Sequence, residues 1–139
     1  MPFHHKDTKT LREEIPERAN LAAEIVVDSA LTVHRALGPG LLESVYSVCL
    51  AHELRKRGVQ VQRELPLPIS YDGILLDAGL RLDMLVDDCV IVELKAVEQL
   101  LPVHHAQVLT YLKLTGHRLG LLINFNTPLI KDGIRRIVL

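Results

Sequence analysis

The sequence has no tryptophan, and aromatic residues make up only 4% of it, which excludes a core built from aromatic clusters. Hydrophobic residues nevertheless make up 48% of the 139 residues, and most of them are aliphatic. A chain of this length can bury one core of ordinary size. We therefore expect one domain in which helices pack on a sheet, in the α/β or α+β class.

Cysteine is almost as scarce. The two cysteines, Cys49 and Cys89, lie far apart in separate apolar runs and form no CxxC pair. They cannot supply the four ligands of an iron–sulfur cluster or of a four-cysteine zinc site within one chain. We expect both to be buried free thiols in a reducing cytoplasm.

The sequence also lacks a membrane segment and a bias of charge. No apolar stretch approaches the roughly 20 residues of a membrane span, and the polar first residues, MPFHHKDTKTLREE, are unlike a signal peptide. These features predict a cytoplasmic protein without membrane contact. Because the formal net charge is only -1, binding of nucleic acid would depend on a local basic patch.

Two parts of the chain differ in pattern. Residues 1–18 are charged and show no apolar period, which predicts a mobile N-terminal arm, and residues 19–139 are expected to form a single domain. Asn20 is the expected N-cap of the first helix. Helices are predicted at residues 20–37, 41–57 and 102–115. Strands are predicted at residues 59–65, 80–86, 90–95, 119–125 and 134–139, with a hairpin at residues 69–76.

The strands at residues 80–86 and 90–95 are joined by a loop whose length decides which side chains face together. A two-residue loop would mix acids and aliphatic residues on both faces. A three-residue loop, residues 87–89, instead brings Asp83 opposite Glu93, with Lys95 and Arg81 nearby. We prefer this register because its other face is wholly apolar, with Val86 opposite Val90, Met84 opposite Val92 and Leu82 opposite Leu94.

Four stretches match the motifs of a known family. They are Gly40-Leu41-Leu42-Glu43-Ser44-Val45-Tyr46, Val92-Glu93-Leu94-Lys95-Ala96, Gln107-Val108-Leu109-Thr110-Tyr111 and Gly120-Leu121-Leu122-Ile123-Asn124-Phe125. Through them the chain resembles the PD-(D/E)XK nuclease superfamily, most closely its GxxExxY proteins, and its QxxxY motif looks like that of the RecB-like and Cas4-like branch. The resemblance implies a restriction-endonuclease-like α/β fold, a mixed β-sheet flanked by helices in the order α-α-β-β-β-α-β with a small extra hairpin.

The resemblance also implies a metal site made of oxygen ligands. Asp83 and Glu93 would be direct ligands, the Leu94 carbonyl would supply another oxygen, and Glu43 would bind directly or through water. Such a set suits Mg²⁺ or Mn²⁺, which prefer oxygen ligands and keep several waters.

The remaining motif residues imply catalytic and positioning roles. Lys95 would orient the attacking water, lower its pKa or stabilise the charge that develops in the transition state. Gln107 and Tyr111, one helical turn apart, would position a phosphate, a water on the metal or Lys95.

Plainer interpretations exist for each of these residues. An E-x-K tripeptide is common in a chain that is 24% charged, Asp83 could pair with Arg81 or Lys95, and Glu43 could only favour the positive end of its helix. Three histidines are expected to be structural, although His34 could also approach the site. His34 would be hydrogen-bonded near the glycine turn, and His104 and His105 would pack on the surface or at the start of a helix.

Two functions are compatible with the sequence. The first is a metal-dependent nuclease that hydrolyses DNA or RNA. The alternative is a noncatalytic module with the same fold, binding a partner protein or nucleic acid in a regulatory or defence role. Nucleic acid is the expected partner, and a homodimer or a protein partner would extend the binding surface. Basic residues that could flank a groove are Arg55, Lys56, Arg57, Lys131, Arg135 and Arg136.

Overall fold

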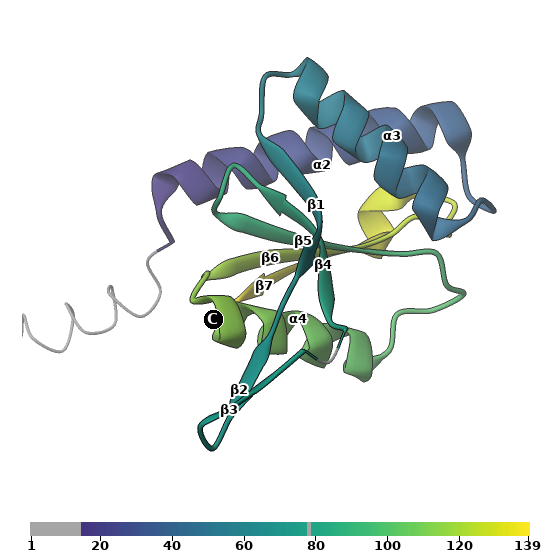
Figure 1. Cartoon of the computed structure of the whole chain (residues 1–139). Helices are drawn as coiled ribbons and strands as arrows, with labels where there is room; N and C mark the ends of the chain where they lie inside the picture. Colours follow the sequence, from purple (N-terminus) through teal and green to yellow (C-terminus); the bar gives the residue numbers. More distant parts are fainter. Residues whose placement is uncertain (1–14, 78) are drawn as a thin grey trace, which may run out of the picture.

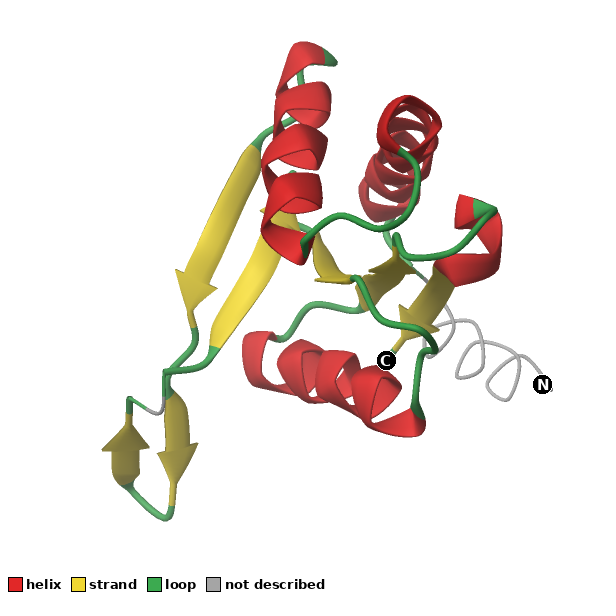
Figure 2. Ribbon diagram, turned by 90° about the vertical axis from the view of Figure 1, so that its right-hand side faces the viewer, coloured by secondary structure: helices red, strands yellow, loops and turns green. Residues whose placement is uncertain are grey.

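Two layers of helices enclose a central sheet in the computed structural model, which describes residues 15–77 and 79–139. Helices α2 (Glu17–Leu37) and α3 (Glu43–Lys56) cover one face, and α4 (Pro102–Thr115) covers the other (Figure 1). A view turned by 90° shows the sheet between these layers (Figure 2). Each face has its own apolar core cluster. The predicted α/β class, a mixed sheet flanked by helices, is confirmed.

Five strands form this sheet in the order β1-β4-β5-β6-β7. β5 and β6 run parallel, and the other neighbouring strands run antiparallel. β5 is therefore central, as its apolar residues predict, and β1 lies at an edge, where a proline is tolerated. The strands are β1 (Val61–Pro66), β4 (Arg81–Val86), β5 (Val90–Lys95), β6 (Leu119–Asn124) and β7 (Ile134–Val138), the last following the short helix η1 (Ile130–Gly133).

The hairpin of β4 and β5 has the predicted three-residue loop, and its register pairs Met84 with Val92. Both side chains lie in the core beneath α2 and α3. The prediction that Leu82 and Leu94 share one apolar face was wrong. Leu82 packs in the second cluster, on the α4 side, whereas Leu94 packs in the first. The neighbouring β1 residue Glu64 has a left-handed φ of 53° at this level, and such a break in strand geometry changes the face on which side chains lie.

The start of the first helix also differs from the prediction. α2 begins at Glu17 with Pro16 as its N-cap, and Asn20 lies within the first turn instead of capping it. Proline suits a helix start because it has no N–H to leave unpaired. Two residues of the predicted arm, 17 and 18, therefore belong to α2, and residues 1–14 lie outside the described part of the chain.

The predicted small hairpin is formed by β2 (Ile69–Tyr71) and β3 (Ile74–Leu76). Its turn residues, Asp72 and Gly73, have positive φ angles of 49° and 78°, as a two-residue hairpin turn requires. The hairpin projects away from the body of the molecule (Figure 2), and its apolar side chains are exposed.

Cys49 and Cys89 are free thiols, as predicted, but both are half-buried instead of fully buried. Cys89 lies in the β4–β5 loop, where partial burial and the neighbouring Asp87 raise the pKa of its thiol. Within the described ranges, no helix combines the length and the apolar character needed to cross a membrane.

Candidate functional site

Glu93 lies at the centre of the candidate site, on the central strand β5. Its residue surface is only 4% exposed, and its Oε2 lies 3.5 Å from Lys95 Nζ. The other oxygen, Oε1, is buried without a hydrogen-bond partner among the described residues. Burial and the nearby charge of Asp83 raise the pKa of Glu93 to about 8, against the opposing influence of Lys95. Lys95 therefore compensates one oxygen of Glu93, and the other oxygen has no partner among the described residues.

Asp83 approaches Glu93 from the neighbouring strand β4. Its Oδ2 accepts the backbone N–H of Leu94 at 2.8 Å, just beyond the last backbone pair of the hairpin register. Burial raises the pKa of Asp83, although the Leu94 N–H and Lys95 act in the opposite direction. Sequence reasoning assigned the Leu94 carbonyl a role; the described contact of Leu94 in the site is its N–H, which holds Asp83 in place.

Glu43, the third acid, is the first residue of α3 and follows the turn of residues 38–42. Partial desolvation and the charge of Asp83 raise its pKa, whereas Lys95 lowers it. Glu43 is exposed on the surface, so it lies at the mouth of the site while Glu93 lies at its base. The three acids and Lys95 are thus near enough to act on one another electrostatically.

The turn before Glu43 is held by a tyrosine whose role sequence reasoning missed. Tyr46 is fully buried and stacks on Phe125 with ring centroids 4.5 Å apart. Its hydroxyl donates to the Gly38 carbonyl at 2.6 Å and accepts the Leu41 N–H at 3.1 Å. The last residue of the GxxExxY pattern therefore fixes the backbone from which Glu43 projects. The only sequence signal was the motif spacing itself.

Gln107 and Tyr111 reach the site from α4, on the other face of the sheet. Gln107 Nε2 donates to the Tyr111 hydroxyl at 2.9 Å, which confirms that the two share a helix face. Burial raises the pKa of Tyr111, and the charges of Glu93 and Asp83 raise it further. The phenol is therefore within electrostatic reach of the acids and stays protonated near neutral pH.

The buried Asn124 is a second residue that sequence reasoning did not single out as functional. Its side chain donates to the Val97 carbonyl at 2.9 Å and accepts the Val97 N–H at 3.0 Å. Asn124 pairs with Lys95 across β5 and β6, so it anchors the chain directly after the lysine. It ends the apolar run of β6, where a buried amide is an unusual residue.

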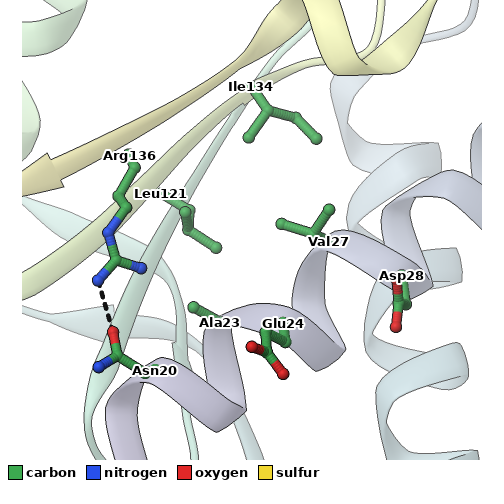
Figure 3. A pocket seen from close by; sticks show the side chains of 8 residues that line it. All are labelled: Asn20, Ala23, Glu24, Val27, Asp28, Leu121, Ile134 and Arg136. Carbon is green, nitrogen blue, oxygen red and sulfur yellow. Dashed lines mark hydrogen bonds between the residues drawn. The ribbon is translucent and has the colours of Figure 1, made fainter. Parts of the chain in front are cut away.

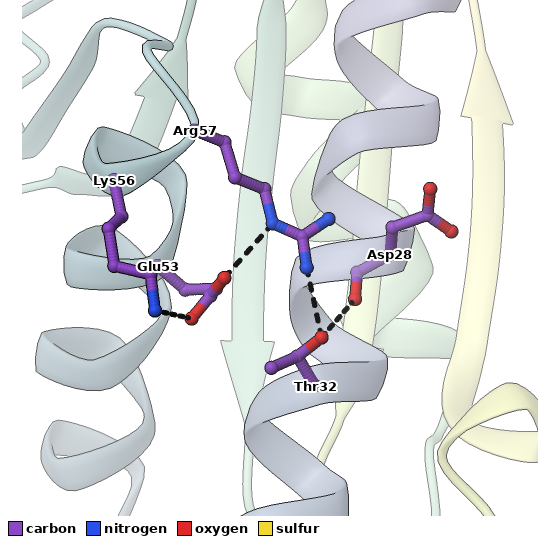
Figure 4. A network of polar contacts seen from close by, with 5 residues as sticks. All are labelled: Asp28, Thr32, Glu53, Lys56 and Arg57. Carbon is purple, nitrogen blue, oxygen red and sulfur yellow. Dashed lines mark hydrogen bonds and ion pairs between the residues drawn. The ribbon is translucent and has the colours of Figure 1, made fainter.

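Several other predicted residues have structural contacts. His34 hydrogen-bonds the Thr127 carbonyl at 2.8 Å, and His104 accepts the Leu101 N–H at the start of α4, as predicted. Lys56 and Arg57 both contact Glu53 at the α2–α3 interface (Figure 4). Those two cations neutralise an acid of their own chain, which reduces their value as a nucleic-acid patch.

The donor set fits a small hard cation. Across residues 15–77 and 79–139, no group of three or more histidine, cysteine or acidic side chains has a spacing that could hold a metal. Asp83 and Glu93 nevertheless supply carboxylate oxygens near each other, one of them buried and unpartnered. Mg²⁺ needs no larger set, because it is often bound through one or two carboxylates and keeps several waters. These residues therefore fit Mg²⁺ or Mn²⁺.

A separate hollow of about 670 Å³ lies between the start of α2 and strands β6 and β7 (Figure 3). Its lining includes the acids Glu24 and Asp28, and Arg136, which is bonded to Asn20. None of the predicted site residues contributes to it. The two acids are exposed, so this hollow lacks the buried and unpaired groups that distinguish the cluster around Glu93.

Comparison with known proteins gave one match. A family model described as the PD-(D/E)XK nuclease superfamily matches residues 20–137, which is most of the chain and includes every residue of the candidate site. The mixed sheet flanked by helices is consistent with a restriction-endonuclease-like fold. No curated protein and no solved structure matches the chain.

Proposed function

The chain belongs to the PD-(D/E)XK nuclease superfamily, and from this premise we propose that it is a metal-dependent nuclease hydrolysing phosphodiester bonds of DNA or RNA. One observation carries the proposal: Glu93 is buried beside a second acid, with one carboxylate oxygen unpartnered among the described residues. Such an arrangement costs stability and is typical of a site that awaits a cation.

Asp83 and Glu93 would hold Mg²⁺ or Mn²⁺, with the Leu94 carbonyl as a further oxygen and Glu43 acting from the mouth of the site, directly or through water. When bound, the cation supplies Lewis-acid stabilisation of the negative charge on the phosphate. The Leu94 N–H keeps Asp83 oriented toward the site. The Tyr46 hydroxyl fixes the turn that carries Glu43.

Lys95 is the proposed catalytic cation. Its ammonium group lies 3.5 Å from Glu93, where it can orient the nucleophile and stabilise charge that develops on the phosphate. Gln107 and Tyr111 form a hydrogen-bonded pair on α4. We assign them the positioning of the phosphate or of Lys95, since both side chains can donate hydrogen bonds to an oxygen.

The assignment to a subfamily and the bounds of the domain are also parts of this proposal. The proposal places the chain among the GxxExxY proteins, on the motif from Gly40 to Tyr46, and near the QxxxY branch, on Gln107 and Tyr111. It also treats residues 19–139 as one domain, which the match over residues 20–137 supports.

A titration of Mn²⁺ into the purified protein tests the metal site without any knowledge of the substrate. Free Mn²⁺ is followed by electron paramagnetic resonance, with Asp83→Ala and Glu93→Ala as variants. Each substitution is expected to weaken binding strongly, because each removes a carboxylate ligand. Glu24→Ala, an exposed acid of the separate hollow, is the matched control and should bind Mn²⁺ like the wild type.

Binding that both site substitutions abolish would support the proposal and lead to cleavage assays on DNA and RNA. Absent binding at millimolar Mn²⁺, or binding that neither substitution changes, would contradict an active nuclease. The protein would then be better described as a noncatalytic module of the same fold.

A further inference from the structure

Arg63 is attached to the helix that carries Glu43, and no ion pair among the described residues includes it. Arg63 lies on the edge strand β1 and is half-buried. Its Nε and Nη2 donate to Ser47 Oγ at 3.2 and 3.1 Å. Ser47 is buried and lies four residues after Glu43, on the same face of α3. The guanidinium is therefore held about one helical turn from the third acid of the site.

The register of β1 and β4 also shows on which face of the sheet Arg63 lies. Arg63 pairs with Met84 across β1 and β4, and Met84 is the neighbour of Asp83. Paired residues of adjacent strands lie on the same face, so Arg63 is on the α2–α3 side, the side from which Glu43 enters the site. Arg63 and Asp83 therefore lie on neighbouring strands, one position apart in the register.

No carboxylate among the described residues lies within ion-pair distance of Arg63. Ion pairs within the described residues join Arg18, Lys56, Arg57 and Lys95 to carboxylates, and none includes Arg63. Its partner Ser47 is neutral. A guanidinium has five N–H donors, so the two bonds to Ser47 orient the group and leave donors for an anion.

We propose that Arg63, oriented by Ser47, binds a backbone phosphate of the nucleic acid next to the phosphodiester that is cleaved. The inference rests on the proposed nuclease function and deepens it by assigning a substrate contact. Guanidinium groups bind phosphate oxygens through two parallel hydrogen bonds. Because the net charge of the chain is only -1, local cations such as Arg63 have to attract an anionic strand.

The rival explanation is that Arg63 only ties β1 to α3. Another arginine already makes such a tie, since Arg55 Nη2 donates to the Val61 carbonyl at 3.2 Å. A structural tie and a phosphate contact differ in their response to salt. Loss of a phosphate contact reduces the slope of log Kobs against log salt by about 1, whereas loss of a structural tie leaves that slope unchanged.

The test measures binding of a labelled single-stranded oligonucleotide by fluorescence anisotropy, in EDTA so that no cleavage occurs, across a series of KCl concentrations. Arg63→Gln is expected to weaken binding about tenfold at low salt and to reduce the salt slope by about 1. Arg63→Lys keeps the charge and should restore the slope, with weaker binding than the wild type because the planar fork is lost. Ser47→Ala should likewise keep the slope.

Arg18→Gln is the control, because Arg18 lies on α2 and its guanidinium is paired with Asp87 at the β4–β5 loop. It should bind the oligonucleotide like the wild type. Circular dichroism and thermal unfolding of each variant show whether the fold is intact. If Arg63→Gln does not fold, the affinity of Arg63→Lys decides: weaker binding than the wild type at an unchanged slope supports the phosphate contact, and wild-type affinity contradicts it.

An unchanged salt slope in Arg63→Gln would overturn the inference, as would a wild-type protein that does not bind the oligonucleotide at low salt. Neither result decides the nuclease proposal, because the Mn²⁺ titration of Asp83 and Glu93 variants involves no nucleic acid. If Mn²⁺ binding depends on Glu93 but Arg63→Gln does not change the salt slope, the metal-site proposal stands and only the phosphate contact is rejected.

Discussion

Glu53 and Glu93 are both glutamates with little exposed surface, 9% and 4% of each residue, yet their surroundings are opposite. Glu53 joins α3 to α2 through Arg57, whose guanidinium also reaches Thr32, and it contacts Lys56 as well (Figure 4). The Arg57 guanidinium holds the pKa of Glu53 below its usual value. Glu93 has a single cation, Lys95, at 3.5 Å and one unpartnered oxygen among the described residues. Burial and the charge of Asp83 outweigh Lys95 and raise the pKa of Glu93 to about 8.

The two acids therefore differ in their contribution to the free energy of unfolding: Glu53 raises it, whereas Glu93 lowers it. A carboxylate with hydrogen-bonded cations contributes to stability, whereas a buried carboxylate beside another acid opposes it. Lys95 pairs with one oxygen of Glu93, and the other oxygen has no partner among the described residues. A cation bound by the folded chain would offset the cost of burying these two acids together.

Lys95→Ala should have the largest effect on activity. Lys95 is the cation paired with Glu93, whereas Lys56 is a cation paired with the structural acid Glu53. We expect nuclease activity to fall about 100- to 1000-fold while Mn²⁺ still binds, since the charge near the phosphate is lost. Single-turnover cleavage of a labelled substrate measures the effect. Lys56→Ala is the matched control and should cleave at the wild-type rate; equal losses in the two variants would remove Lys95 from catalysis.

Glu93→Gln should stabilise the metal-free protein. Because the pKa of Glu93 in the folded state, about 8, lies above its usual value, the folded chain holds the extra proton and loses stability as pH rises from about 4.5 to about 8. Removing the charge should flatten this decline and raise the free energy of unfolding above pH 8 by roughly 2–4 kcal/mol. Urea unfolding in EDTA at several pH values measures it.

Added Mn²⁺ provides the control for that variant. Ligand that binds only the folded state stabilises it by mass action, so Mn²⁺ should stabilise the wild type at high pH and have little effect on Glu93→Gln. A variant that is less stable than the wild type at every pH would show that Glu93 is a structural acid after all.

Tyr46→Phe tests how the third acid is held in place. The substitution leaves the Gly38 carbonyl and the Leu41 N–H without their partner, which should cost about 1–2 kcal/mol of stability. Nuclease activity should fall further than the small loss of folded protein accounts for, because the turn before Glu43 is loosened. Thermal unfolding and single-turnover rates measure the two effects, and full activity would show that Glu43 does not depend on this turn.

Glu53→Gln should have a smaller effect than Glu93→Gln, and of opposite sign. Since the pKa of Glu53 is lowered in the folded state, its contribution to stability is present above its usual pKa and is lost as pH falls through the folded value. The variant should therefore be less stable than the wild type near neutral pH and equal to it in acid. Urea unfolding at neutral and acid pH measures the difference, and a variant more stable at neutral pH would contradict it.

Local rules recovered much of this architecture. α4 spans Pro102–Thr115 as predicted, because a proline at its start and Gly116 in the left-handed region at its end are strong signals. The register of β4 and β5 followed from loop length and the need for an apolar face. The spacing of four residues correctly predicted that Gln107 and Tyr111 share a helix face, where they form a hydrogen bond.

Features that depend on contacts between distant segments could not be predicted in this way. Asn20 was a plausible cap, but Pro16 starts the helix. The Arg63 contact with Ser47 joins a strand to a helix, and the bond of Asn124 to Val97 joins the end of β6 to the segment after β5. Neither pair shows a periodic pattern along the chain. The unpartnered oxygen of Glu93 likewise depends on which groups surround it after packing, and no local sequence signal reports that.

The short loop between β4 and β5 has a consequence for the order in which the molecule assembles. A hairpin closed by three residues is an element of low contact order, and such elements form quickly because little chain entropy is lost on closure. Asp83 and Glu93 lie on the two arms of this hairpin. The two acids therefore come close to each other when the hairpin forms, early in folding. The later docking of α3 and α4 then buries acids that are already neighbours.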